Sequence, residues 1–80
     1  MTTAKRFFEE ADVQRAILRA IAAKPTGTIT AHELRNAVAD ALATQMTPAF
    51  LRAFRRSLRR MLLDGELTSR SLGAVFTGAR

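Results

Sequence analysis

The residues best suited to chemistry in this chain are five arginines that fall within nine positions. They are Arg52, Arg55, Arg56, Arg59 and Arg60. A guanidinium group carries a permanent positive charge and binds phosphate or carboxylate bidentately. A charge run often makes only a solvated helix face, but such a face normally places acids three or four residues from the bases. Here only Arg60 has one, Asp64, so the pattern favours an anion-binding surface.

The charge of the whole chain agrees with this interpretation. Residues 1–40 hold six basic and five acidic side chains, a net of +1, and residues 41–80 hold seven and two, a net of +5. A local positive field favours nucleic acid or an anionic membrane surface as the partner. A membrane-surface helix is disfavoured because the apolar side of the same helix is needed for the domain core.

The chain lacks residues that several classes of protein need for their function. The chain has no cysteine, one histidine (His32) and four glycines. We therefore expect no metal site, no Gly-rich phosphate loop, no cofactor and no enzymatic activity, with His32 either exposed or part of the capping region of its helix. Tryptophan and tyrosine are absent, so stacking platforms for single strands are poorly supplied. We see neither a signal peptide nor a stretch near the roughly 18 apolar residues of a membrane span, and we expect a cytoplasmic protein.

Eighty residues predict a single domain, with residues 1–11 as an N-terminal extension and 78–80 as a tail. The stretch ADVQRAILRAIAAKP predicts a first helix, with Asp12 as its N-cap and an end at Pro25 and Gly27. Phe7 and Phe8 precede it. We expect these rings to pack under the domain, and a dimer contact is the alternative.

Two capping signals mark the next helices. Thr30 and Glu33 fit a capping box, which predicts a helix over about 31–43 after a short strand in GTIT. Thr47 as N-cap, Pro48 at the first helical position and Gly65 at the end predict a third helix over about 48–64. Hydrophobic staples are expected in the pairs Ile29 with Leu34 and Met46 with Leu51, and by spacing Met46 and Met61 belong to the core.

The third helix is predicted to be amphipathic. On a helical wheel one face carries the five arginines, and a separate face carries Leu51, Phe54, Leu58, Met61 and Leu62. Beyond this helix, residues 67–68 and 75–77 favour strand, with SLG between them as a turn. The C-terminal part is therefore predicted to be a β-hairpin.

The order helix, short strand, helix, helix, hairpin, with the basic helix third, resembles the winged helix-turn-helix family of DNA-binding domains. The resemblance is carried by GTITAHEL, by TPAFLRAFRRSLRRMLLDGEL and by TSRSLGAVF, within residues 12–77. It implies an α+β fold of three helices, with the short strand between the first two and the hairpin as the wing. It also implies that the third helix enters the major groove of duplex DNA.

The resemblance also implies a contact for each candidate residue, according to its position in the helix, the preceding turn or the wing. Arg52, Arg55 and Arg56 are candidates for base edges, where arginine pairs with guanine O6 and N7. The candidates for phosphate contacts are Arg59 and Arg60 of the helix, Gln45 and Thr47 of the preceding turn, and Arg70 of the wing.

The sequence thus predicts a small protein that binds double-stranded DNA. Its expected role is transcriptional regulation, or an architectural role on a phage, plasmid or other mobile element. Members of the family often bind as dimers on paired half-sites, so a homodimer is one expected form. The alternative function is a winged-helix interaction module that docks on an acidic partner in a larger complex.

Overall fold

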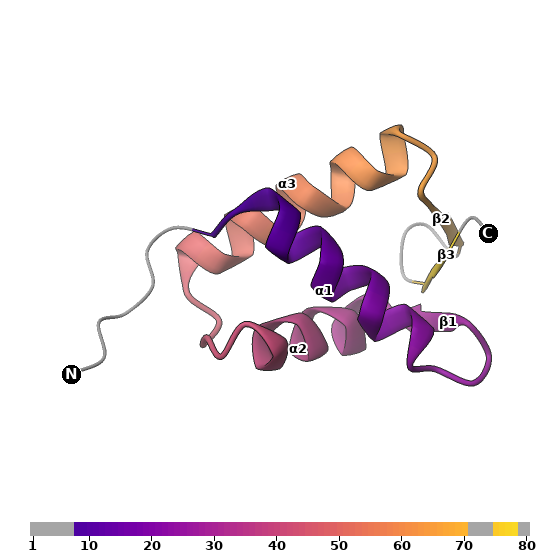
Figure 1. Ribbon diagram of the computed structural model, residues 1–80, viewed down its shortest axis with the longest axis horizontal. Coiled ribbons are helices and arrows are strands. Elements are labelled where there is room, and N and C mark those ends of the chain that lie inside the picture. The colour runs from indigo at the N-terminus through magenta and orange to yellow at the C-terminus, as the bar shows by residue number, and fades with distance from the viewer. Residues whose placement is uncertain (1–7, 71–74, 79–80) are drawn as a thin grey trace.

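The computed structural model describes residues 8–70 and 75–78, without the side chains of Arg70 and Val75. The helices are α1 (Glu10–Ala22), α2 (Ala31–Ala41) and α3 (Pro48–Leu63), and the strands are β1 (Thr28–Thr30), β2 (Leu67–Arg70) and β3 (Val75–Gly78). Helix α1 packs against both α2 and α3, and the small sheet lies at one end of the helices (Figure 1). The predicted α+β class with three helices and three strands is confirmed.

The sheet joins a strand from the N-terminal half of the chain to the two C-terminal strands. Its strand order is β1-β3-β2, and both pairings are antiparallel. Phe76 in the middle strand lies opposite Ile29 on one side and Ser69 on the other. Ile29 and Phe76 are buried, as is Leu67 at the start of β2, so the sheet turns one apolar face to the helices. The predicted turn SLG lies outside the described residues.

The start of α1 differs from the prediction. The helix begins at Glu10 with Glu9 as N-cap, so the prediction of Asp12 as N-cap was wrong. Glu10 and Asp12 both lie in the first turn, where the helix dipole favours negative charge. The predicted extension is also shorter, because Phe8 is buried and its ring lies edge-on to Phe50 at a centroid distance of 5.8 Å. Phe7 lies outside the described residues.

The capping box of α2 is confirmed. The amide of Glu33 donates to Oγ1 of Thr30 over 3.2 Å, and the amide of Thr30 donates to Oε1 of Glu33 over 3.3 Å. The helix ends at Ala41, two residues before the predicted end. Ala43 has a left-handed φ of 52°, a conformation that cannot continue a right-handed helix.

The start of α3 follows the predicted signals, with one exception. Thr47 caps the helix by accepting from the Phe50 amide over 3.2 Å, and Pro48 occupies the first turn. The helix ends at Leu63, and Gly65 beyond it has the expected left-handed φ, at 79°. Met46, however, is 40% exposed, so its prediction as a core residue was wrong. Its expected staple partner Leu51 is half-buried and packs against the core.

The buried side of α3 is rotated relative to the prediction. Phe54 and Met61 are buried as expected, but Leu51, Leu58 and Leu62 are only half-buried, while Phe50 and Ser57 are buried instead. At about 100° per residue this is a rotation of about 60° away from the arginines. The leucines therefore form a border between the core and the basic side of the helix.

The core is one cluster built from all three helices and the sheet. Its members are Phe8, Val13, Ala16, Ile17, Ile21, Ile29, Leu34, Val38, Ala39, Phe50, Phe54, Met61, Leu67 and Phe76. The rings of Phe50 and Phe54 stack at 5.9 Å, and Phe8 meets Phe50 from its edge. This aromatic group fixes α3 against the start of α1.

Candidate nucleic-acid interface

The side of α3 that faces away from the core carries the arginine face, which consists of Arg52, Arg55, Arg56, Arg59 and Arg60. All five side chains are exposed. The residues buried on the opposite side hold the helix in one orientation, so the five guanidinium groups project from the same side. Four of them, together with Leu63, line a shallow hollow of about 340 Å³. The five residues that line it are Arg55, Arg56, Arg59, Arg60 and Leu63.

Most of the arginine face is not neutralised by acids. Within residues 8–70 and 75–78, Arg52, Arg55, Arg56 and Arg59 form no ion pair. Arg60 does form one, but its partner is Glu10 of α1, with Nε to Oε1 at 3.7 Å. The sequence had suggested Asp64 on the same helix, which instead caps the helix C-terminus. Four like charges therefore lie close together with no local compensation, an arrangement that favours binding of an anion.

The predicted phosphate contacts outside α3 are at its two ends. Gln45 is exposed and Thr47 half-buried just before the first turn. Oγ1 of Thr47 accepts from the Phe50 amide, and its O–H can still donate to a ligand. The backbone of Arg70 pairs with Val75 in the sheet, which lies at the opposite end of α3 (Figure 1). The side chain of Arg70 lies outside the described part of the chain.

Leu63 belongs to the arginine surface but was not predicted from the sequence. This side chain is 77% exposed and lies four residues after Arg59 and three after Arg60, so it shares their face of the helix. The signal was available, because the helical wheel extended by one residue past Leu62 places Leu63 in the middle of the arginines. Leu63 gives the basic surface one large apolar contact.

The single histidine is part of a small surface contact. His32 is exposed, and its Nδ1 lies 3.0 Å from Nη2 of Arg35. Among the described residues, no group of three or more His, Cys, Asp or Glu side chains could hold a metal ion.

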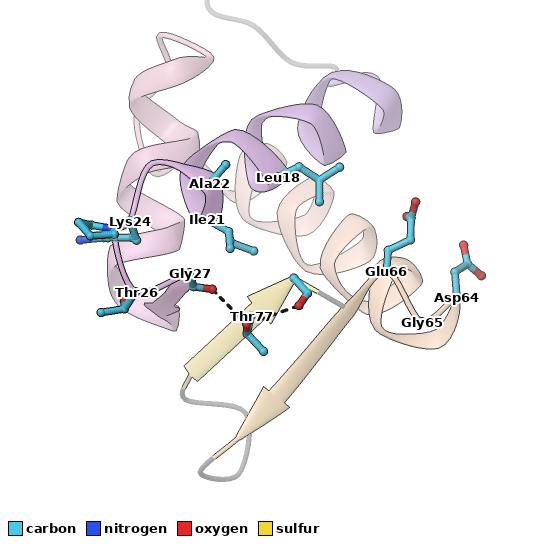
Figure 2. Close-up of a pocket in the computed structure, with 12 residues that line it drawn as sticks. Leu18, Ile21, Ala22, Lys24, Thr26, Gly27, Asp64, Gly65, Glu66 and Thr77 are labelled. Carbon is cyan, nitrogen blue, oxygen red and sulfur yellow. Dashed lines mark hydrogen bonds between the residues drawn. The ribbon is translucent and has the colours of Figure 1, made fainter. Parts of the chain in front are cut away.

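A larger cavity of about 880 Å³ lies between the end of α1, the loop before β1, the loop after α3 and the end of β3. Figure 2 shows Lys24 and Thr26 on one side of it and Asp64 and Glu66 on the other. Lys24 is paired with Glu33 over 2.9 Å, and the two carboxylates on the far side do not converge with it on one point. The cavity thus lacks the convergent polar groups that mark a ligand site, and the arginine face is the stronger candidate.

Comparison with protein-family models, with curated proteins and with solved structures gave no match to this chain. In the part of the chain that the structure describes, no helix has the length and apolar character needed to cross a membrane.

Proposed function

We propose that this protein binds double-stranded DNA through the arginine face, as a small winged-helix transcriptional regulator or architectural protein. The observation that carries the proposal is the set of four exposed guanidinium groups that make no ion pair within the described residues, on a helix whose other side is held by the core. Such groups neutralise backbone phosphates and release the counterions condensed on DNA, which favours association. The protein acts by binding and carries out no catalysis.

The topology supports a winged-helix arrangement. The strand between α1 and α2 joins the C-terminal hairpin in the order β1-β3-β2. The hairpin is therefore part of the same sheet that packs against the helices. In a winged helix this hairpin is the wing, and the third helix is the one that reads DNA. The third helix here is α3, which carries the arginine face.

The dimensions of α3 suit the major groove. Its 16 residues make a helix about 24 Å long at 1.5 Å per residue, and a groove about 12 Å wide admits an α-helix. Arg52 and Arg55 lie in its N-terminal half and Arg56 lies at its middle, and these three are the proposed base contacts. Arg59, farther along, is the proposed phosphate contact, with Gln45 and Thr47 meeting phosphate before the first turn.

One observation favours a second function. Leu63 lies among Arg55, Arg56, Arg59 and Arg60 in the shallow hollow, and a leucine surrounded by cations also suits an acidic protein segment that carries an apolar side chain. This is the protein-interaction alternative. Leu63→Ser separates the two, because it weakens binding to such a protein and leaves binding to DNA phosphates nearly intact.

The experiment is a titration of labelled duplex DNA at several salt concentrations. The wild type is compared with Arg55→Ala/Arg59→Ala and with the matched control Arg15→Ala/Arg19→Ala. Both variants remove two exposed arginines four residues apart, but the control removes them from α1. We expect the α3 variant to lose about 0.9 of salt slope for each phosphate contact that is lost, and the control to keep the wild-type slope.

A broader variant decides the proposal as a whole. Replacing all five arginines of the arginine face and Arg70 by alanine should abolish the salt-dependent affinity. If this variant binds duplex with wild-type affinity and salt dependence, or if the wild type binds no duplex at all, DNA binding by this face is wrong. Leu63→Ser then tests the protein-interaction alternative.

A further inference from the structure

Arg60 differs from the other four members of the arginine face because it is paired across two helices. Its Nε lies 3.7 Å from Oε1 of Glu10, in the first turn of α1. Arg60 itself lies in the last turn of α3. The side chains of Arg60 and Glu10 are 60% and 39% exposed, so solvent and ligand still reach the guanidinium group.

The carboxylate depends on this arginine more than the partial exposure of the pair suggests. Oε1 of Glu10 is itself buried, and within the described residues it accepts no hydrogen bond. A buried carboxylate oxygen without a partner is unfavourable. The positive charge of Arg60 and the N-terminus of α1 are what compensate it.

This arrangement sets up a competition for Arg60. A phosphate that draws the guanidinium group away leaves Oε1 of Glu10 buried and without its cation. The loss is subtracted from whatever the new phosphate contact contributes. Arg52, Arg55, Arg56 and Arg59 make no ion pair among the described residues, so phosphate binds to them without a comparable loss.

We propose that Glu10 is an autoinhibitory residue that withholds Arg60 from the nucleic-acid interface and limits its affinity. The inference rests on the proposed DNA binding by the arginine face. It adds the limit of the contact surface on α3, because Arg59 is then the last arginine of this helix that contributes to binding. It also assigns α1 a part in binding that its own charge pattern does not indicate. A change that neutralises Glu10 adds one phosphate contact.

The test is a double-mutant cycle on duplex affinity as a function of salt, made with the full chain. The proteins are the wild type, Glu10→Gln, Arg60→Ala and the double variant, with Glu9→Gln as the matched control. Glu9 is exposed at the start of the same helix, and Glu9→Gln changes the net charge equally without touching Arg60. Melting temperatures establish that each protein is folded, and Glu10→Ala is the second variant if Glu10→Gln destabilises the fold.

Glu10→Gln should raise duplex affinity by up to about fivefold, the upper end of what an exposed ion pair contributes. It should also increase the salt slope by about 0.9, the value for one phosphate. Arg60→Ala should change the wild-type slope little and should cancel the whole gain in the Glu10→Gln background. Glu9→Gln should give a smaller gain in affinity and no change in slope.

Three results would overturn the inference. If the gain from Glu10→Gln survives Arg60→Ala, Glu10 acts only through its general charge. If Arg60→Ala lowers the wild-type slope by a full contact, Arg60 already meets phosphate and nothing withholds it. If the wild type has no affinity for duplex at any salt concentration, the proposed function fails and the inference fails with it, whereas the first two results leave DNA binding intact.

Discussion

The hydroxyl of Thr77 donates a hydrogen bond to the backbone carbonyl oxygen of Gly27 over 3.0 Å, between residues that are 50 positions apart. Figure 2 shows this bond linking the loop before β1 to the end of β3. Gly27 has a left-handed φ of 72°, the conformation that lets the loop turn back into the sheet. The bond joins the N-terminal part of the fold to the hairpin that forms its other end.

Thr77→Val should therefore lower the free energy of unfolding by about 1 kcal/mol, because it keeps the β-branched shape and removes the hydrogen bond. Chemical denaturation measures the effect. The control is Thr68→Val, since Thr68 lies opposite Thr77 in the sheet and its side chain is exposed. Equal losses in the two variants would show that the bond to Gly27 contributes nothing specific.

Because the buried side of α3 is rotated relative to the sequence prediction, its apolar residues should contribute unequally to stability. Phe50 is fully buried and packs on two other rings, so Phe50→Ala should lower the free energy of unfolding by about 3–5 kcal/mol. Leu58 is half-buried at the border, and Leu58→Ala should lower it by clearly less. Thermal or urea unfolding ranks them. A larger loss of unfolding free energy for Leu58→Ala would mean that the buried side of α3 is the one predicted from the helical wheel.

The two capping threonines separate stability from binding. Thr30→Ala and Thr47→Ala each remove one side-chain cap, and each should lower the free energy of unfolding by about 1 kcal/mol. Only Thr47 lies at the start of α3, so only Thr47→Ala should also weaken duplex binding by folded protein. Denaturation and duplex titration are run on the same samples. A selective loss of binding in Thr30→Ala would show that Thr30 contacts DNA instead.

The Lys24–Glu33 pair predicts a pH dependence of stability. The hydrogen bond from Lys24, and then those from Thr30, hold the pKa of the Glu33 carboxyl below its ordinary value of 4.5. A carboxyl whose pKa is lowered by folding stabilises the fold above its unfolded pKa, and this contribution is lost as the pH falls through the folded value. Lys24→Met should therefore flatten the fall in melting temperature on acidification below about pH 5.

The control for this measurement is Arg19→Met. Arg19 is an exposed cation in the last turn of α1, the helix that precedes Lys24, and no carboxylate among the described residues pairs with it. The Arg19→Met substitution should leave the pH dependence of the melting temperature unchanged. Identical profiles for the wild type and Lys24→Met would show that Lys24 does not lower the pKa of Glu33.

The arginine face predicts two kinds of binding defect. Arg55→Ala should cost about 1–3 kcal/mol on a preferred site and flatten sequence preference there, if the residue meets a base edge. Arg59→Ala should weaken all sequences alike and reduce the salt slope by about 0.9. Titrations of specific and scrambled duplexes at several salt concentrations distinguish the two. If both variants behave in the second way, α3 contacts only the backbone.

The sequence by itself determined the elements and most of their ends. The capping box joins Thr30 to Glu33 and the cap of α3 joins Thr47 to Phe50, and each bond spans three residues, so the local sequence contains both partners. The separation of arginines from apolar residues on α3 is likewise a matter of helical periodicity. For this reason the helices, the strands and the arginine face could be predicted.

Only the tertiary structure decided which apolar residues of α3 are buried and which member of the arginine face pairs with an acid on another helix. Leu51, Leu58 and Phe50 are all apolar, and the ring of Phe8 packing on Phe50 is part of what distinguishes them. Arg60 has an acid nearby in sequence, yet its partner is Glu10 on another helix. Packing energies and ion pairs depend on distances between segments that the chain order does not specify. Which residues are buried and which are paired is therefore decided only when α1 and α3 pack together.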